Sequence, residues 1–467
     1  MILTKKDKFD TYFSNQPLHI RLLLVLVVSI FFPIYITIPI VITVCIFIIK
    51  DNEMRNTILD APDLMLYAFM GLLLLVIPLI YNNYVGFFCG ILVIMFFVLE
   101  FYIRRVMTKD LFSTICTLCC GMSLFCAVIA AGEKLSGIQI RVDALTGNAN
   151  YYAYLIELMV IICLYKFVTT KKHVYIFIFA VNIAALILTG CRSAWFALLI
   201  GLLIFSLIQK NKHTFIVLTA ISLALAAAIY FYPDILPRYD DLDFSLIDRL
   251  TIWRKALADF FAHPLFGRGL FAYSQISGSE IQPHAHSIFI ECLESTGIVG
   301  TTIAVLYVGS VIKDLVHSWK SGNEQIKARV ALCGGLMAAT FTHGITDAPI
   351  MGAQTGLFFI LALSLRPRVR TSPAVAAEMY QKQYRVLESV SEPLKAKMFR
   401  FMEFRIKIKS PMTEEAVGVI LRELRKLSSD ENEQIAILNQ SMAKGNMGVT
   451  ALKKQPHRPS VQRGNIR

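Results

Sequence analysis

Long apolar runs follow one another through most of this 467-residue chain. Backbone N–H and C=O groups find no water partner in hydrocarbon, so an apolar run of about 17–25 residues predicts a helix that spans a membrane. Only 17% of the residues are charged, against roughly a quarter in soluble domains. The spans expected from these runs are residues 63–80, 84–103, 111–131, 151–168, 173–190, 194–209, 213–232, 287–312, 328–346 and 350–366.

The first apolar run, residues 20–49, contains Pro33 and Pro39. Its length and its prolines suit two short helices better than one long span, so we expect a helical hairpin here. With this hairpin, the sequence predicts an all-α polytopic membrane protein with about twelve transmembrane helices. No small-residue cleavage site follows the first run, which argues against a cleavable signal peptide.

Lys and Arg in short loops indicate which side of a membrane faces the cytoplasm. When the predicted spans are counted in order, the basic loops and both termini fall on one side, which is therefore the cytoplasmic side. The sequence thus predicts a transmembrane domain at residues 1–366, with a long extracytoplasmic loop at residues 233–285. The basic residues that set this orientation are Lys5, Lys6, Lys8, Arg104, Arg105, Lys109, Lys166, Lys171, Lys172, Lys210, Lys212, Lys313, Lys320, Lys327 and Arg329.

The net charge of +13 is concentrated in the C-terminal tail, where residues 366–467 hold 20 Lys and Arg against 10 Asp and Glu. We therefore expect residues 367–467 to form a basic cytoplasmic helical tail, disordered after Gly445. The stretch 376–408 suits amphipathic helices on the membrane surface, and a helical tail in solvent is the alternative. A basic tail beside anionic lipid accounts for the charge without a nucleic-acid partner.

The ten cysteines fall within or at the ends of predicted spans, and four of them crowd one apolar stretch, residues 116–126. A zinc site needs converging thiolates with polar groups around them, and no histidine lies near this stretch. The cysteines are better explained as small buried apolar side chains, so no structural metal is predicted.

Basic residues are few on the side opposite the cytoplasm, and three arginines there stand in distinctive surroundings. Arg141 precedes Gly147-Asn-Ala-Asn150, Arg192 lies in the tight turn Thr189-Gly-Cys-Arg192-Ser193, and Arg249 opens Arg249-Leu-Thr-Ile-Trp253. An arginine so close to hydrocarbon is costly unless it meets an anion or reaches water. Because a guanidinium binds phosphate with two parallel hydrogen bonds, these arginines are candidate phosphate ligands.

Further motifs follow Arg249 along the chain, and the last of them lies inside a predicted span. They are His263-Pro-Leu-Phe-Gly-Arg-Gly269, Pro283-His-Ala-His286-Ser287 and Gly297-Ile-Val-Gly300. The order of all these motifs resembles that of the O-antigen ligase/Wzy polymerase family of membrane glycosyltransferases, whose Gly-Asn-Pro-Asn loop and Thr-x-Ser-Arg turn are similar to residues 147–150 and 189–192. Ala149, Cys191 and Ser287 depart from the pattern, and Ser287 replaces an asparagine that commonly follows the histidine.

The resemblance implies transfer of a glycan from a polyprenyl (undecaprenyl) pyrophosphate carrier to a hydroxyl acceptor on the outer face of the bacterial cytoplasmic membrane. Membrane lipid and polysaccharide export or chain-length proteins are the other partners that it implies. Polymerisation of repeat units into a cell-envelope polysaccharide is favoured here because the outer loop is short. Ligation of a finished glycan to a lipid or wall acceptor is the alternative. A flippase for the same lipid-linked glycan is a third, but no inverted repeat with broken spans supports it.

Catalysis of this kind needs positively charged side chains beside the pyrophosphate, and a base that is neutral near pH 7. Arg192 and Arg249 are the candidate catalytic arginines and His286 is the candidate base, because histidine titrates near neutral pH. The candidate substrate-binding residues are Arg141, His284, Glu291, Glu294 and His343. The two glutamates either pair with an arginine or orient the base, and His343, which Asp347 follows, is the one most easily explained by packing. No nucleotide-binding loop or Asp-x-Asp signature with a partner motif is present, so a metal-independent transfer without cofactor is expected.

Overall fold

The computed structural model describes the chain as two compact units, residues 1–369 and residues 370–467. The described residues form helices and turns, with no strand among them, which confirms the predicted all-α class. The residues that the structure describes are 16–59, 64–137, 140–212, 215–217, 219–220, 231, 242–276, 283–367, 387, 390–407, 412 and 414–452.

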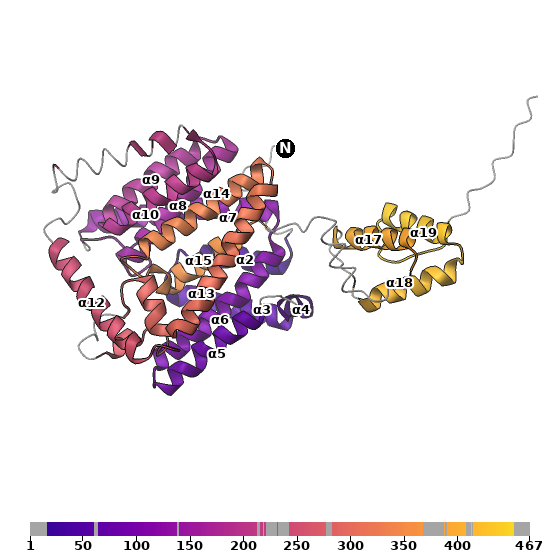
Figure 1. The fold of residues 1–467 in the computed structure, drawn as a ribbon. Coiled ribbons are helices and arrows are strands. Elements are labelled where there is room, and N and C mark those ends of the chain that lie inside the picture. The colour runs from indigo at the N-terminus through magenta and orange to yellow at the C-terminus, as the bar shows by residue number, and fades with distance from the viewer. Residues whose placement is uncertain are drawn as a thin grey trace, which may run out of the picture. The chain divides into compact units, whose positions relative to one another are not determined.

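The first unit is a bundle of helices packed side by side, with α8 near its centre (Figure 1). Two short 3₁₀ helices, η3 (Ala272–Gln275) and η4 (Pro349–Met351), lie in its connections. The α-helices are α2 (Leu18–Ser29), α3 (Ile34–Lys50), α4 (Asn52–Leu59), α5 (Leu64–Ile80), α6 (Tyr84–Val106), α7 (Lys109–Ser136), α8 (Ala149–Thr170), α9 (Val174–Thr189), α10 (Arg192–Ile208), α12 (Leu242–Ala262), α13 (Ile288–Ser321), α14 (Glu324–His343) and α15 (Ala353–Ser364).

Four of the described helices, α6, α7, α8 and α13, are long and apolar enough to cross a membrane. Six others, α2, α3, α5, α9, α10 and α15, are apolar but have 10–17 residues. The run at 20–49 forms two helices, and Pro33 ends the turn between them while Pro39 lies inside α3. Most of the predicted span at 213–232 lies outside the described residues. Residues 233–241 and 277–282 of the predicted loop lie outside them as well. The number of twelve spans stays a prediction.

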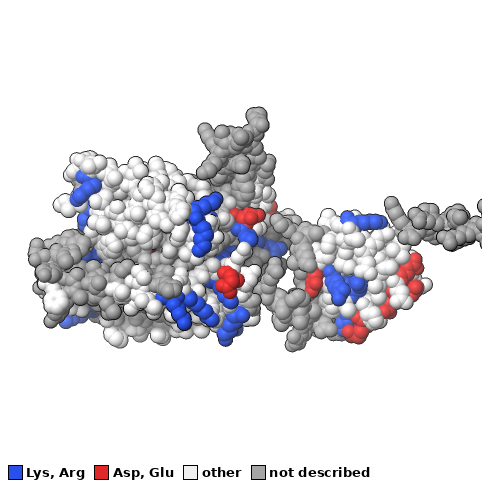
Figure 2. Space-filling model, turned by 90° about the horizontal axis from the view of Figure 1, so that it is seen from above, with Lys and Arg blue, Asp and Glu red and all other residues white. Residues whose placement is uncertain are grey.

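The charged side chains of the first unit lie towards its two ends, and the face between them is uncharged (Figure 2). An uncharged band between two charged ends is what a surface facing lipid requires. Within the bundle, α10 crosses α14 closely, because a Cβ on Gly201 would lie 2.9 Å from the Gly335 carbonyl oxygen. Small residues at such a crossing allow helix backbones to approach and pack without a hydrophobic driving force.

Several connections meet at the end of the first unit where α8, α10 and α13 begin and α14 ends, which we call the site end. Gln354 donates a hydrogen bond to the Phe32 carbonyl oxygen there, and Asn83 donates to the carbonyl oxygens of Arg268 and Leu270 at 3.3 and 2.9 Å. These bonds tie the α2–α3 turn to the start of α15 and the α5–α6 turn to the segment that precedes α13.

The second unit contains α17 (Glu392–Lys407), α18 (Glu414–Leu427) and α19 (Glu431–Ala443). Its apolar side chains, including Met398 and Phe401 of α17 and Leu424 of α18, are buried in a core of its own. The sequence predicted that the apolar face of this stretch could lie on a membrane surface. In α17 that face is covered by the other helices of this unit. The tail after residue 452 lies outside the described residues.

Candidate active site

His286 lies at the site end, directly before α13, and adopts a left-handed backbone conformation with φ of 49°. Left-handed backbone is unfavourable for a histidine and occurs preferentially where the surroundings hold a functional side chain. Its Nδ1 lies 3.1 Å from Oδ1 of Asp347, and its side chain is 21% exposed whereas that of Asp347 is 2% exposed. The imidazole is thus anchored by a buried carboxylate and is itself partly exposed.

Asp347, in the turn after α14, is held by three donors. Its Oδ1 also accepts the Ala348 N–H at 2.8 Å, and its Oδ2 accepts the Asn150 amide at 2.7 Å. Burial opposes ionisation of Asp347, but the hydrogen bond and charge of His286 outweigh it and bring the pKa of Asp347 well below its usual range. An ionised Asp347 favours the tautomer of His286 that carries its proton on Nδ1, so the lone pair of the neutral imidazole lies on Nε2.

His284 packs edge-on against His286, with ring centroids 4.5 Å apart. Its Nδ1 accepts the backbone N–H of His286 at 3.2 Å, and its Nε2 lies 3.3 Å from the Tyr151 hydroxyl. Burial, aided by the nearby His286 and Arg249, lowers the pKa of His284 to about 4. His284 is therefore neutral at pH 7 and supports the backbone of His286.

Arg249 reaches this group from α12. Trp253, one turn further along α12, donates its indole N–H to the His286 carbonyl oxygen at 3.4 Å and so fixes α12 beside the histidines. The Nη1 of Arg249 is buried and has no hydrogen-bond partner among the residues that the structure describes. A buried guanidinium nitrogen without a partner is costly, and an anionic ligand would satisfy it.

Arg141 connects the turn before α10 with the start of α8. Its Nε donates to the Thr189 carbonyl oxygen at 2.8 Å, and its Nη2 donates to Oδ1 of Asn150. Asn148 caps α8 by accepting the N–H groups of Asn150 and Tyr151 at 2.8 and 3.3 Å. The chain of bonds from Arg141 through Asn150 and Asp347 ends on His286, so Arg141 acts on the site through its neighbours.

Arg192 is the first residue of α10, and Cys191 before it makes no side-chain cap bond to this helix. The first N–H groups of a helix and the positive end of its dipole favour an anion, and an arginine at that position adds a full charge. Arg192 therefore lies where a phosphate group is favoured, in the turn that Arg141 also contacts.

Glu291 and Glu294 both lie in α13 and are both buried, but their surroundings differ. Glu291 accepts the Ala285 N–H at 2.8 Å and the Ser295 hydroxyl at 2.9 Å, so it braces the segment that carries His286. Both carboxylate oxygens of Glu294 lack a hydrogen-bond partner within the described part of the chain. The structure thus gives Glu291 an orienting position, while Glu294 lies one turn deeper in α13.

The His263–Gly269 turn packs against a break in α13. Gly297 leaves the helical conformation with φ of 62°, and Ile298 N–H instead donates to the Pro264 carbonyl oxygen at 2.8 Å. The carbonyl oxygens of Glu294 and Ser295 are freed by this break and accept the N–H groups of Arg268 and Gly269. A Cβ on Gly297 would lie 2.4 Å from the Leu265 carbonyl group, so glycine is required there.

His343, at the end of α14, is fully buried and paired with Glu157 of α8, with 2.9 Å between Nδ1 and Oε2. Its Nε2 lies 3.3 Å from the Ser193 hydroxyl and 3.9 Å from the Cys191 thiol, beside Arg192. The next residue, Gly344, accepts the Ile288 N–H at 2.8 Å and the Ser287 hydroxyl at 3.4 Å. The end of α14 therefore braces both the Arg192 turn and the His286 segment.

Replacing either Glu157 or His343 with leucine is expected to lower the free energy of unfolding by about 3–5 kcal/mol, because each change leaves the other charge buried without its partner. The double variant is expected to lose less than the sum of the two. Thermal unfolding of the detergent-solubilised single and double variants measures this coupling. Additive losses would show that the two side chains do not form a stabilising pair.

An apolar cavity of about 820 Å³, which we call the upper cavity, opens beside these residues. Tyr151, Pro283 and Glu291 line it near the site, and most of its other lining residues come from α3, α5, α6, α13 and α15, with Phe341 of α14 among the remainder. The volume lies in the range of about 300–1,000 Å³ that is usual for ligand sites. A ligand with a polar head and an apolar body fits this combination.

Three of the described side chains, those of His284, His286 and Asp347, lie close enough together to bind one metal ion. One donor atom each from His284, His286 and Asp347 lies within 4.8 Å of the others. The oxygens of Asp347 and the Nδ1 atoms of both histidines already take part in the hydrogen bonds described above. A metal ion would therefore displace bonds that orient His286.

The structure brings Arg249, His284, His286 and Glu291 together, and it places Arg141, Arg192 and His343 around them through shared hydrogen-bonded turns. Sequence reasoning left four contributors out of the proposed site: Asn150, Tyr151, Glu157 and Asp347. Glu157 and Asp347 are carboxylates within or beside apolar runs, and such residues signal a functional or paired position.

Comparison with known protein families agrees with the motifs. Residues 176–305 match the model of the O-antigen ligase family, which confirms the resemblance. This range contains Arg192, Arg249, His284, His286 and Glu291, and it supports an O-antigen ligase- or polymerase-type function in glycan assembly.

The same match and the apolar helices indicate a multi-pass membrane protein. Residues 393–464 match the model of the YdaU C-terminal domain. None of the curated proteins matches the chain.

Proposed function

We propose that the protein transfers a glycan from a polyprenyl pyrophosphate carrier to a hydroxyl acceptor on the outer face of the bacterial cytoplasmic membrane. The observation that carries this proposal is the partly exposed His286, held by the buried Asp347, together with the buried Nη1 of Arg249 and the upper cavity that Glu291 lines. The match to the O-antigen ligase family over residues 176–305 supports the class of reaction.

In the proposed reaction, the acceptor oxygen attacks the anomeric carbon of the glycan and its proton passes to Nε2 of His286. The bond between that carbon and the pyrophosphate oxygen breaks, and the polyprenyl pyrophosphate leaves with the bonding electrons. Arg249 and Arg192 hold its charge as it develops. Asp347 stabilises the imidazolium that forms, as a buried carboxylate does in other histidine-base systems.

We further propose that the acceptor is another lipid-linked unit, so that the reaction polymerises repeat units. Complementation of a deletion strain, with glycan length and carrier-linked intermediates read on a gel, tests both levels of the proposal. His286→Ala, Arg192→Ala and Arg249→Ala, at matched membrane levels, are expected to accumulate lipid-linked glycan. Accumulated single units indicate a polymerase, and accumulated full chains indicate a ligase. Normal product from His286→Ala would contradict the mechanism.

The transfer is expected to be independent of metal, because the three donor groups that face one another already orient the base by hydrogen bonds. Treatment of the purified protein with EDTA, followed by gel filtration, is expected to leave the rate of transfer unchanged. Loss of activity that added Mn²⁺ or Zn²⁺ restores would assign His284, His286 and Asp347 to a metal site instead.

His284 is expected to stay neutral from pH 5 to pH 8, because its pKa of about 4 lies below this range. Its protonation contributes nothing to the pH dependence there. His284→Gln is therefore expected to lower kcat/KM by about tenfold or less while the shape of its pH profile between pH 5 and 8 stays that of the wild type. A shifted acidic limb in this variant would show that His284 itself titrates.

A further inference from the structure

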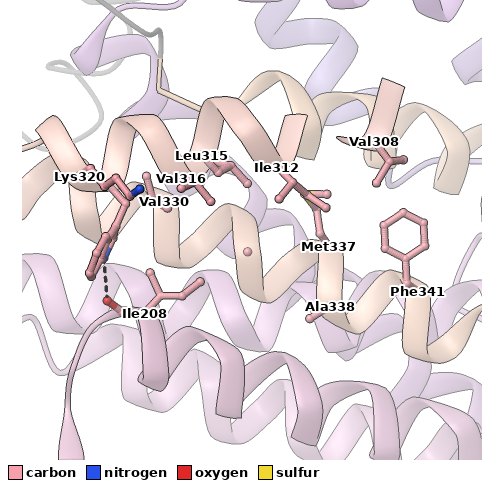
Figure 3. A pocket seen from close by; sticks show the side chains of 12 residues that line it. Ile208, Val308, Ile312, Leu315, Val316, Lys320, Val330, Met337, Ala338 and Phe341 are labelled. Atoms are coloured by element: carbon pink, nitrogen blue, oxygen red, sulfur yellow. Dashed lines mark hydrogen bonds between the residues drawn. The ribbon is translucent and has the colours of Figure 1, made fainter. Parts of the chain in front are cut away.

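A second apolar cavity of about 570 Å³ lies between α10, α13 and α14 (Figure 3). Its α13 residues lie further from the site end than those of the upper cavity. We call this second cavity the lower cavity. Val308 of α13 and Phe341 of α14 line both cavities, so the two meet at these side chains. The lower cavity is lined almost wholly by apolar side chains.

One face of α13 lines both cavities. Its lining residues recur at intervals of three or four over most of the helix, which places them on a single stripe. The stretch from Glu291 to Trp319 is about 40 Å long at about 1.5 Å per residue, whereas the hydrocarbon core of a bilayer is about 30 Å thick. The α13 residues that line the cavities below the Gly297 break are Ile303, Ala304, Tyr307, Val308, Ile312, Leu315, Val316, Trp319 and Lys320.

The lower cavity ends at a polar floor. Trp319 donates its indole N–H to the Ile208 carbonyl oxygen at 3.1 Å (dashed line in Figure 3). The Lys210 ammonium lies 5.0 Å from the centre of the Trp319 ring. An apolar chain that enters from the upper cavity would stop at this floor. A phospholipid acyl chain covers only about half of the hydrocarbon thickness, so a single ligand that fills both cavities needs a much longer chain.

We propose that the last isoprene units of the polyprenyl carrier occupy the lower cavity while its pyrophosphate lies beside Arg249 and His286. This inference rests on the proposed function and adds a selection for carrier length. The chain passes between Val308 and Phe341, and the site thus recognises the far end of the carrier as well as its head.

Photo-crosslinking with undecaprenyl pyrophosphate that carries a diazirine on its terminal isoprene unit tests this placement without glycan transfer. Mass spectrometry is expected to locate the crosslinks on the lower-cavity residues Val316, Met337 and Ala338. Farnesyl pyrophosphate with the same terminal label is expected to crosslink only to upper-cavity residues. Crosslinks of the long probe to the upper cavity alone, or scattered over other helices, would overturn the proposal.

Ala338→Phe fills the lower cavity, and Ala184→Phe, on an exposed position of α9 outside both cavities, is its matched control. Ala338→Phe is expected to reduce lower-cavity crosslinking about tenfold, which corresponds to a loss of roughly 1.4 kcal/mol. The control is expected to keep the wild-type yield. Equal yields from the two variants would show that the chain end does not occupy this cavity.

Transfer rates measured with glycan donors on long and on short carriers test the selection for carrier length separately from the transferase function. The wild type is expected to prefer the undecaprenyl donor, and Ala338→Phe to lose most of that preference. Equal rates from both donors in the wild type would refute the length selection and leave the transferase function standing. No transfer from either donor would refute the proposed function itself.

Discussion

Replacement of His286 by alanine is expected to reduce the rate of glycan transfer by about 10²–10⁴-fold, the usual contribution of a general base. The acceptor hydroxyl would have no group to take its proton, because His284 already uses Nδ1 to accept the His286 N–H and faces Tyr151 with Nε2. The initial rate of product formation from lipid-linked glycan, with equal amounts of protein in the membrane, measures the effect.

Two further variants locate the cause of this loss. Asp347→Asn keeps the size of the side chain but removes the charge that fixes the His286 proton on Nδ1, so a loss of similar size, about 10²–10⁴-fold, is expected. His173→Ala, at the other end of the bundle before α9, is a control expected to retain the wild-type rate. A wild-type rate in Asp347→Asn would show that the pair does not prepare the base.

Replacement of Arg249 by alanine is expected to lower the rate by about 10²–10³-fold, as removal of one donor to a developing anion does. Trp253 fixes α12 beside the histidines, and the charge of Arg249 acts on His284 from the same helix. The buried Nη1 of Arg249 has no partner among the described residues. The loss is expected mainly in kcat, because the charge on the leaving pyrophosphate grows as the glycosyl bond breaks.

Arg254→Ala, five residues further along α12 and exposed, is the matched control for this prediction. It removes the same charge from the same helix without touching the histidines, so it is expected to change the rate less than threefold or so. Arg249→Lys is expected to recover part of the activity, since it restores the charge but not the planar fork. Equal effects of Arg249→Ala and Arg254→Ala would remove Arg249 from the site.

Helices and their approximate ends followed from the sequence because apolar runs and backbone hydrogen-bond requirements act locally. The Asn148 cap of α8 and the left-handed Gly190 after α9 are likewise local. The motifs around Arg249 and His286 could be found along the chain, and the family match over residues 176–305 covers them.

The contacts that complete the site could not be read from the sequence. Asn150 and Asp347 are 197 positions apart, and Glu157 and His343 are 186 positions apart. No local periodicity encodes which carboxylate meets which histidine, because this depends on how α8 packs against the end of α14. The left-handed backbone of His286 is similarly set by its neighbours, including Trp253 and Asp347, rather than by its own preference.

The most direct test of the central claim is reconstitution of the purified protein in liposomes with a polyprenyl pyrophosphate-linked glycan and an acceptor. Product length and released carrier pyrophosphate are measured for the wild type, His286→Ala and Arg249→Ala. The account predicts elongated glycan and an equal amount of released carrier with the wild type, and little of either with the two variants. Glycan transfer by His286→Ala at the wild-type rate, or donor turnover without any new glycosidic bond in the wild type, would contradict it.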